Sequence, residues 1–206
     1  MSRIDGLMKP KVLIAVPYHS HIEEECRDSI DAMLAYCASE GKYDVIFKKE
    51  RCSDLAQGRN SLIHFSLDNG FAFILHQDAD QTSPPDALSR LMAHDKDIVC
   101  ATACKRGDDK GKPVGQPLHG GWKNSGLIEM DVVGSCFMLQ KLSIFHHSKI
   151  VMPAYCGAQD VAFGQAVACD NVFCAKARDA GFKIWCDMGL TKEIGHIGKK
   201  TFYVNL

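Results

Sequence analysis

Two aspartates one residue apart carry the strongest chemical signal in the chain. Asp78 and Asp80 stand in the segment HQDADQ, directly after an apolar run at residues 71–76. Residues two apart in an extended segment project to the same side, and open α/β sheets bind ligands beyond the carboxyl ends of their strands. Such a pair can hold a hard divalent ion, or one carboxylate can bind the metal while the other binds a sugar hydroxyl. A solvated acidic turn is the alternative, and the position after a strand favours the functional interpretation.

Short apolar runs supply the strands that must position this pair. They lie at residues 11–16, 43–47, 71–76 and 97–103, with helix-like segments between them. A continuous apolar run bounded by turn residues is typical of a strand buried on both faces. The alternation therefore predicts an α/β fold in which helices flank a mostly parallel, nucleotide-binding type of sheet.

Capping residues mark where the intervening helices are expected to begin. Ser20 with Glu23 three residues later forms a capping box, and Ser53 or Asp54 can cap the next helix. Ser83, followed by proline, is expected to cap the third helix. Each helix would then follow its strand after only a few residues.

The pattern changes after residue 106. Residues 107–126 are rich in glycine, lysine and polar side chains and predict a long mobile loop. Residues 127–133 and 135–140 indicate two strands, or one bent strand, on either side of a glycine. A helix near 170–180 and a strand over 182–187 follow, and the glycine-rich tail at 189–200 is expected to be a loop.

Composition excludes several classes of function. The chain has 206 residues, 46% of them hydrophobic, and a formal net charge of -1. A general nucleic-acid binder would show a basic patch or stripe, so nucleic acid is not an expected partner. No stretch approaches the roughly 20 apolar residues of a membrane span, and no signal peptide opens the chain. Ten cysteines without a C-x-x-C pair indicate buried reduced thiols, which favours a soluble protein of the cytoplasm.

Seven segments in a characteristic order give the chain a resemblance to the GT-A fold glycosyltransferases, of the family 2 type. They are VLIAVPYHS, CSDLAQGRNSLI, FILHQDAD, DIVCATACKR, MDVVGSCFML, CDNVFCAKARDAGFKIWCD and GHIG. The resemblance covers nearly the whole chain and extends to the N-terminal domain of a chlorella-virus glycosyltransferase. It implies one GT-A domain over residues 1–206, with a nucleotide-binding half at 1–106, the mobile loop at 107–126 and an acceptor-side half at 127–206. Whether that domain is part of a larger protein stays open, and a viral protein would act in the host-cell cytoplasm.

The resemblance implies where a nucleotide-sugar donor binds. The end of the first strand would meet the base and ribose, Asp54 would add a base contact, and Asp78 would hold the ribose. Arg59 would reach the nucleotide or its diphosphate through its guanidinium fork, unless it is only a helix-surface arginine. Asp131 either orients the sugar or acceptor or is structural. The residues expected to bind the donor are Pro17, Tyr18, His19, Asp54, Arg59, Asp78, Ala79, Gly134 and Ser135.

The resemblance also implies a metal site and a catalytic base. Asp80, Asp78 and the late His196, which lies between two glycines, would bind Mn²⁺ or Mg²⁺, and an imidazole ligand suits Mn²⁺ better. The base is expected in ACDNVF, where related proteins carry Glu-Asp and this chain carries a cysteine followed by Asp170. Asp160 in GAQDVAF is the competing candidate.

The predicted function is transfer of a hexose or deoxyhexose from a UDP-sugar to a hydroxyl of a glycan or glycoprotein acceptor, with inversion. A haloacid-dehalogenase type of phosphatase is an alternative, because DADQT fits its D-x-D-x-T motif, with Asp78 as nucleophile and Asp80 as acid/base. That class needs a later acidic pair, and Asp108 with Asp109 is the only candidate. A non-catalytic nucleotide-sugar-binding module is a further alternative. No G-x-G-x-x-G follows the first strand, which disfavours a dinucleotide-dependent dehydrogenase.

Overall fold

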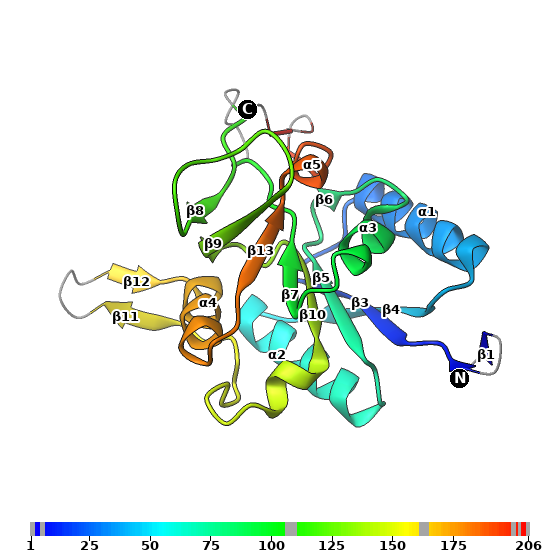
Figure 1. Ribbon diagram of the computed structural model, residues 1–206, viewed down its shortest axis with the longest axis horizontal. Coiled ribbons are helices and arrows are strands. Elements are labelled where there is room, and N and C mark those ends of the chain that lie inside the picture. The colour runs from blue at the N-terminus through cyan, green and yellow to red at the C-terminus, as the bar shows by residue number, and fades with distance from the viewer. Residues whose placement is uncertain are drawn as a thin grey trace.

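An eight-stranded mixed sheet forms the centre of the computed structural model (Figure 1). The structure describes residues 3–4, 7–105, 111–160, 165–198, 201 and 203–204. In spatial order the strands are β4 (Asp44–Arg51), β3 (Lys11–Tyr18), β5 (Phe73–Gln77), β10 (Phe137–Lys141), β7 (Ile98–Cys100), β13 (Ile184–Asp187), β9 (Leu127–Val133) and β8 (Gly115–Pro117).

Most strands of this sheet run in one direction. β3 pairs in parallel with β4 and with β5, and β7 pairs in parallel with β13. β10 is inserted antiparallel between β5 and β7, and β9 lies antiparallel between β13 and β8. The predicted mostly parallel α/β sheet is confirmed, and the two strands expected around residue 134 are separate and lie apart in the sheet.

Helices cover both faces of the sheet. α1 (Glu24–Glu40), α3 (Ala87–Ala93) and α5 (Met188–Thr191) pack on one face, while α2 (Leu55–Asp68), α4 (Cys169–Asp179) and the 3-10 helix η1 (Leu142–His146) pack on the other. Strand β3 shows why both faces fill, because Leu13 belongs to one apolar cluster and its neighbour Ile14 to the other. Both side chains are fully buried. Burying each stabilises the fold by about 1.5–3 kcal/mol relative to exposure.

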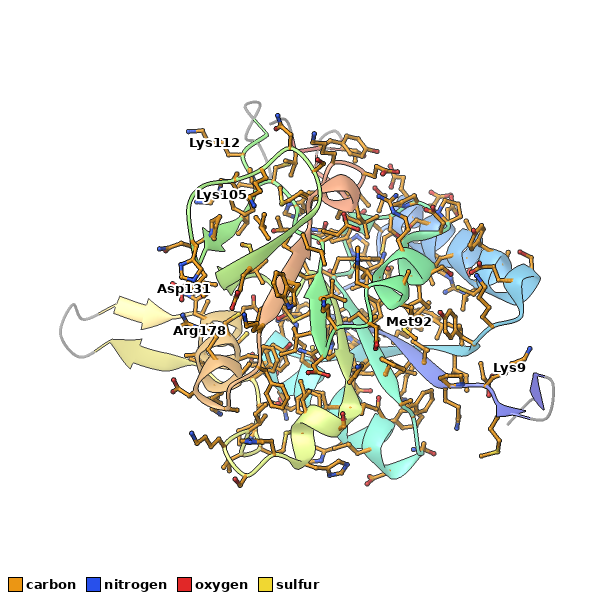
Figure 2. The ribbon with its side chains drawn as sticks, viewed as in Figure 1. Lys9, Met92, Lys105, Lys112, Asp131 and Arg178 are labelled. Atoms are coloured by element: carbon orange, nitrogen blue, oxygen red, sulfur yellow. The ribbon has the colours of Figure 1, made fainter. Side chains whose placement is uncertain are left out.

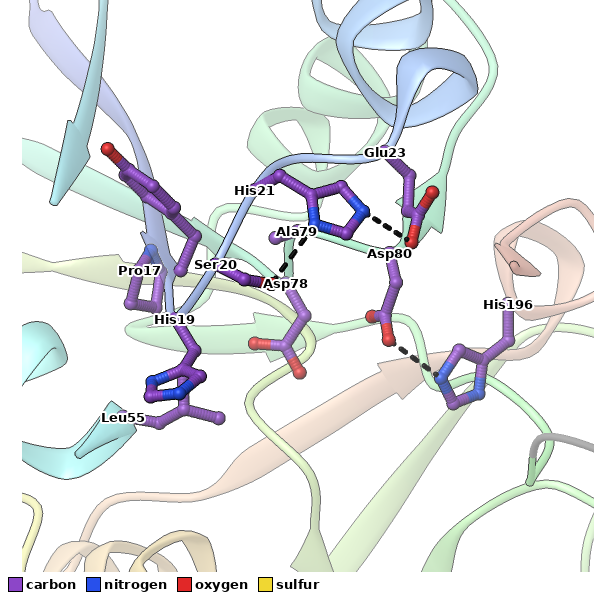
Figure 3. Close-up of a pocket in the computed structure, with 11 residues that line it drawn as sticks. Pro17, His19, Ser20, His21, Glu23, Leu55, Asp78, Ala79, Asp80 and His196 are labelled. Atoms are coloured by element: carbon purple, nitrogen blue, oxygen red, sulfur yellow. Dashed lines mark hydrogen bonds and ion pairs between the residues drawn. The ribbon is translucent and has the colours of Figure 1, made fainter. Parts of the chain in front are cut away.

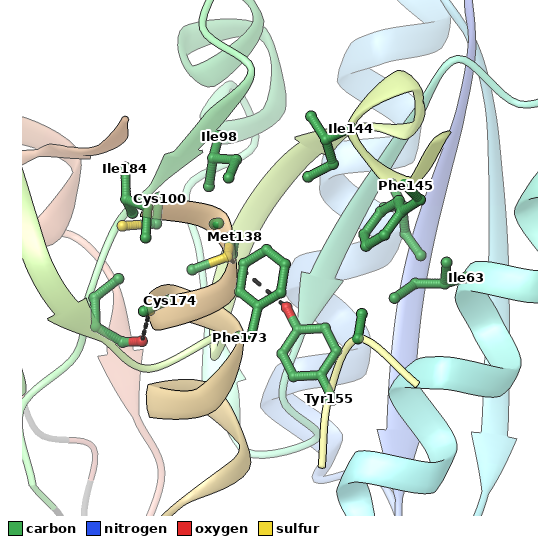
Figure 4. Packing of buried hydrophobic residues seen from close by; sticks show 14 of the residues in the cluster. Ile63, Ile98, Cys100, Met138, Ile144, Phe145, Tyr155, Phe173, Cys174 and Ile184 are labelled. Atoms are coloured by element: carbon green, nitrogen blue, oxygen red, sulfur yellow. Dashed lines mark hydrogen bonds between the residues drawn. The ribbon is translucent and has the colours of Figure 1, made fainter. Parts of the chain in front are cut away.

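Aromatic side chains fill the face beneath α2 and α4 (Figure 4). The rings of Tyr155 and Phe173 stack with centroids 4.7 Å apart and planes inclined by 15°. The ring centroids of Phe145 and Phe173 are 6.4 Å apart. Buried cysteines such as Cys100 and Cys174 pack here as small apolar side chains.

Two of the predicted helix starts are wrong. α1 begins at Glu24, its N-cap Glu23 makes no side-chain capping bond, and Ser20 Oγ bonds His21 Nδ1 at 3.0 Å instead. α3 begins at Ala87, and Ser83 lies outside it. In both cases bends or turns lie between the strand and its helix, at residues 19–20 before α1 and at 79–80 and 85–86 before α3. Asp54 does cap α2, where its carboxylate accepts from the Ala56 N–H at 2.8 Å.

Two segments expected to be loops contain regular structure. Within 107–126, β8 pairs with β9 at the sheet edge, so the prediction of one continuous loop is wrong there. Residues 107–110 of that expected loop lie outside the described residues. The tail forms α5 and then β14 (Gly195–His196), which pairs with β6 (Gln81–Thr82). The other short strands are β1 (Arg3–Ile4) with β2 (Leu7–Met8), and β11 (Ala158–Asp160) with β12 (Gln165–Val167).

Candidate active site

A pocket of about 510 Å³ opens beyond the carboxyl ends of β3 and β5 (Figure 3). Both the expected donor segment at the end of β3 and the two aspartates after β5 reach it. The pocket is lined by Pro17, Tyr18, His19, Ser20, His21, Glu23, Leu55, Asp78, Ala79, Asp80 and His196. Sequence reasoning missed Ser20, His21, Glu23 and Leu55, although the first three directly follow the strand end.

A two-stranded pairing places the late histidine beside the second aspartate. In β14 and β6, His196 is the register partner of Gln81, one residue after Asp80. The N–H of Ile197 donates to the Asp80 carbonyl at 2.8 Å and continues this pairing. As a result, His196 Nε2 lies 3.5 Å from Asp80 Oδ2, and Figure 3 shows the two side chains facing each other.

The tautomer of His196 follows from its second contact. Its Nδ1 lies 2.7 Å from the carbonyl oxygen of Cys104, so Nδ1 carries the hydrogen and donates it. In the neutral ring Nε2 then presents its lone pair toward Asp80. A backbone acceptor on one nitrogen that orients the other is the usual support of a metal-binding histidine.

This donor set fits a divalent cation of the Mn²⁺ type, which accepts both carboxylate and imidazole. Within the described residues, no three or more His, Cys, Asp or Glu side chains lie close enough together to hold a metal ion. Asp78, predicted as a further metal ligand, does not join Asp80 and His196 in such a group, and the described residues offer these two as a pair. A bound cation would complete its shell with diphosphate oxygens and water.

Asp78 has a different environment from Asp80. Its Oδ1 accepts from Arg59 Nη2 at 2.7 Å, and Arg59 Nη1 lies 3.2 Å from Asp170 Oδ1. The Arg59 side chain is only 3% exposed, so the alternative of a helix-surface arginine is wrong. The structure therefore joins three predicted site residues, Arg59, Asp78 and Asp170, in one ion cluster around the buried guanidinium.

The charges of this cluster are mutually dependent. Burial lowers the pKa of Arg59, but the carboxylates of Asp78 and Asp170 outweigh burial and raise that pKa overall, so the guanidinium stays charged. Desolvation raises the pKa of Asp78, while the nearby guanidinium acts in the opposite direction. Removing the arginine would leave two neighbouring carboxylates without their shared counter-charge.

A close helix contact positions Arg59. At Gly58 a Cβ would lie 2.6 Å from Cys52 Sγ and 3.1 Å from Pro17 Cβ, so only glycine lets α2 approach the end of β3 this closely. The next residue, Arg59, then points beneath Asp78. Asp54, the expected base contact, caps this helix, and the residue after it, Leu55, lines the pocket.

The remaining predicted residues lie around this centre. His19 lines the pocket and its Nδ1 lies 3.2 Å from the Cys52 carbonyl oxygen. Ser135 is fully buried in the connection from β9 to β10, next to Gly134. Asp160 is the last residue of β11, and the structure describes only its backbone. Asp131 of β9 forms an ion pair with Arg178 of α4, and Figure 2 labels both residues.

Comparison with known proteins supports the fold. Residues 35–117 match the Anp1 family. Among solved structures, A197 from STIV superposes with a TM-score of 0.60 at 14% identity, covering 95% of each chain. By sequence, no curated protein matches the chain significantly.

Two glycosyltransferase structures superpose at a similar level. A variant of Drosophila β1,4-galactosyltransferase 7, in complex with manganese, UDP-Gal and xylobiose, has a TM-score of 0.56 and 14% identity over 96% of this chain and 71% of its own. GalNAc-T7 with UDP, GalNAc and Mn²⁺ has a TM-score of 0.56 and 11% identity over 98% of this chain and 45% of its own.

A glycosyltransferase involved in glycosylation of the major capsid of PBCV-1 also matches, at a TM-score of 0.39, which is too low to support a closer relationship. Within the described residues, no helix has the length and apolar character needed to cross a bilayer.

The two glycosyltransferase superpositions at a TM-score of 0.56 confirm the expected architecture: the chain has the GT-A fold of glycosyltransferases.

Proposed function

We propose that this chain is a metal-dependent glycosyltransferase that moves a hexose or deoxyhexose from a UDP-sugar to a hydroxyl of a glycan or glycoprotein. The observation that carries the proposal is the Asp80–His196 pair at the edge of a pocket beyond the carboxyl ends of β3 and β5. The presence of UDP and manganese in two structures of the same fold supports the choice of donor and metal.

The donor would lie across the two strand ends. Pro17, Tyr18 and His19 present one side of the pocket to the nucleoside, and Ala79 brings the chain close to it on the other. Asp78 offers a carboxylate oxygen to a ribose hydroxyl. Gly134 and Ser135 lie on the sugar side in this proposal.

The metal would be held by Asp80 Oδ2 and by His196 Nε2. When bound, Mn²⁺ supplies Lewis-acid stabilisation of the negative charge that develops on the diphosphate leaving group. The protein contributes the orientation of both ligands, through the β6–β14 pairing and the hydrogen bond from His196 to Cys104.

Asp170 is the proposed general base. It lies in the first turn of α4, where its Oδ1 is 3.2 Å from Nη1 of Arg59. A carboxylate oxygen of Asp170 takes the proton of the acceptor hydroxyl while that oxygen bonds to the anomeric carbon. The bond from the anomeric carbon to the diphosphate breaks, UDP leaves, and the single displacement inverts the anomeric centre. We place this reaction in the cytoplasm, or in the host-cell cytoplasm for a viral protein.

Metal-dependent release of UDP tests the proposal. Purified protein is incubated with UDP-glucose, UDP-galactose or the deoxyhexose donor UDP-rhamnose, with Mn²⁺ or with EDTA, and UDP is measured. We expect release from at least one donor with Mn²⁺, and its loss with EDTA and in Asp80→Ala. Asp28→Ala, on the exposed face of α1, is the matched control and should behave as the wild type.

The same assay separates the alternatives. Phosphate release from a phosphomonoester, without UDP release, would indicate the phosphatase. Binding of UDP without turnover of any donor would indicate a non-catalytic module. Full activity in Asp80→Ala would refute the metal role of this residue.

A further inference from the structure

The guanidinium of Arg59 bridges two carboxylates that come from distant parts of the chain. Asp78 follows β5, at 2.7 Å from Nη2, and Asp170 opens α4, at 3.2 Å from Nη1. Because the guanidinium is planar and rigid, two contacts through different nitrogens fix both the separation and the relative orientation of the two carboxylates. One of them faces the donor pocket, and the other is the proposed base.

Two stacked aromatic rings support one face of the guanidinium. It lies over the ring of Tyr155, with Cζ 5.6 Å from the ring centroid, and that ring stacks on Phe173 (Figure 4). Asn60, the next residue in α2, makes two hydrogen bonds to the backbone of Tyr155: its Nδ2 donates to the carbonyl at 2.6 Å, and its Oδ1 accepts from the N–H at 3.0 Å. Arg59 therefore contacts the two carboxylates, and Asn60 holds the Tyr155 ring on which the guanidinium lies.

The position of Arg59 is poorly suited to binding a diphosphate directly. It is not among the residues that line the pocket, and both terminal nitrogens already contact carboxylates. A buried ion cluster of this kind is weak evidence for stability, because desolvation of three charged groups offsets their attraction. Control of geometry at the site is the role that this arrangement serves.

We propose that Arg59 is a positioning residue that aligns the base Asp170 with the donor-side Asp78, in place of the expected contact with the donor diphosphate. This inference rests on the proposed function and deepens it. Arg59 acts through Asp170 and touches neither substrate nor metal. A lysine at this position has one point of charge and cannot hold both carboxylates in a fixed plane.

The test compares Arg59→Lys with Arg90→Lys. Arg90 Nη1 also lies between two carboxylates, at 2.8 Å from Glu193 and 3.8 Å from Asp86. It is not among the residues that line the pocket, so it controls for replacing an ion-paired arginine by lysine as such. For Arg59→Lys we expect kcat for Mn²⁺-dependent UDP release to fall about 100-fold, the cost typical of a misplaced catalytic group. KM for the UDP-sugar and the ratio of UDP affinity to uridine affinity should stay within about threefold. Arg90→Lys should match the wild type.

Non-additivity then shows whether Arg59 works through the base. Adding Arg59→Lys to Asp170→Asn should lower kcat little further, because residues that act as a unit are not additive. Should Arg59→Lys not fold, as judged by thermal unfolding, Asn60→Ala replaces it. Asn60→Ala removes both hydrogen bonds to the Tyr155 backbone, so the ring beneath the guanidinium can move. We expect a lower kcat with KM unchanged.

Three results would overturn the inference. A selective loss of UDP affinity relative to uridine, with kcat retained, would restore the direct diphosphate contact. Equal activity of Arg59→Lys and Arg90→Lys, or fully additive losses in the double variant, would remove the link to Asp170. Absence of UDP release from every donor in the wild type is a separate outcome, since it refutes the proposed function itself.

Discussion

Single residues at this site divide into two charge groups with different tasks. Asp80 and His196 face each other at the pocket edge, while Asp78 and Asp170 share the buried Arg59. The D-x-D spacing alone suggests two equivalent carboxylates. Their surroundings make them unequal, because Asp78 contacts the buried guanidinium of Arg59, whereas Asp80 faces the imidazole of His196.

The choice of base is tested by Asp170→Asn against Asp160→Asn. Loss of the proton acceptor should lower kcat by about 10²- to 10⁴-fold, while UDP affinity changes little. Steady-state kinetics of UDP release and calorimetric titration with UDP give the two quantities. If kcat falls in Asp160→Asn and stays at the wild-type value in Asp170→Asn, then Asp160 of β11 is the base and the assignment to Asp170 is wrong.

Buried His76 makes a prediction about pH and stability. Burial first, and the charge of Arg59 second, lower the pKa of His76 to about 3. The unfolded chain binds a proton here below its ordinary pKa of about 6.5. Protonation of the unfolded chain therefore lowers the free energy of unfolding as pH falls. This free energy has its full value above pH 6.5 and decreases toward pH 3, by up to about 1.4 kcal/mol per pH unit.

Urea unfolding at pH 7, 6 and 5 checks this expectation. His76→Leu should lose less stability on acidification than the wild type. His64→Gln, exposed on α2, is the control and should keep the wild-type pH dependence. Equal pH dependence in His76→Leu and the wild type would contradict the neutral, buried state of His76.

At the scale of elements, the short β6–β14 pairing brings together the two residues of the proposed metal site. Gly195 permits it, because a Cβ there would lie 2.3 Å from Thr82 Oγ1 and 2.7 Å from Thr201 Cγ2. Neither strand has more than two residues. The pairing is thus held by tight packing at its ends and by the bond from Ile197 to Asp80.

Gly195→Ala should consequently separate folding from metal binding. The added methyl group would push β14 away from β6 and move His196 from Asp80, in a two-stranded sheet that is separate from the eight-stranded one. We expect a small change in the thermal midpoint of the apo protein and loss of the extra stabilisation that UDP gives with Mn²⁺. Gly121→Ala, where a Cβ meets nothing within 4 Å, should respond like the wild type. A normal Mn²⁺ response in Gly195→Ala would show that the pairing is dispensable.

The sequence predicted the long elements and the pocket side of the sheet well, for physical reasons. Continuous apolar runs gave β3, β5 and β7 because those strands are buried on both faces. The pairing of β10 with β5 and β7 escaped prediction, since strand order depends on contacts between distant segments. β14 was missed because a two-residue strand has no periodicity, although the glycines beside His196 marked the right place. The bridge from Arg59 to Asp170 spans more than a hundred residues and left no local pattern.

At the scale of the whole molecule, the sheet interleaves strands from both halves of the chain. β10 from the second half lies between β5 and β7 of the first, and the carbonyl before it, that of Cys136, accepts from the N–H of Asp78 at 2.8 Å. The donor-side strand ends, α4 with its proposed base and the tail with His196 therefore converge on one edge of the sheet. This convergence is what the GT-A fold provides to the proposed reaction.

The most direct test is the anomalous diffraction of crystals grown with UDP and MnCl₂, recorded at the manganese absorption edge. We predict one strong peak within coordination distance of Asp80 Oδ2 and His196 Nε2, with the diphosphate of UDP completing the shell and Asp78 still bound to Arg59. Ordered UDP in the pocket without a manganese peak beside Asp80 and His196 would contradict the account.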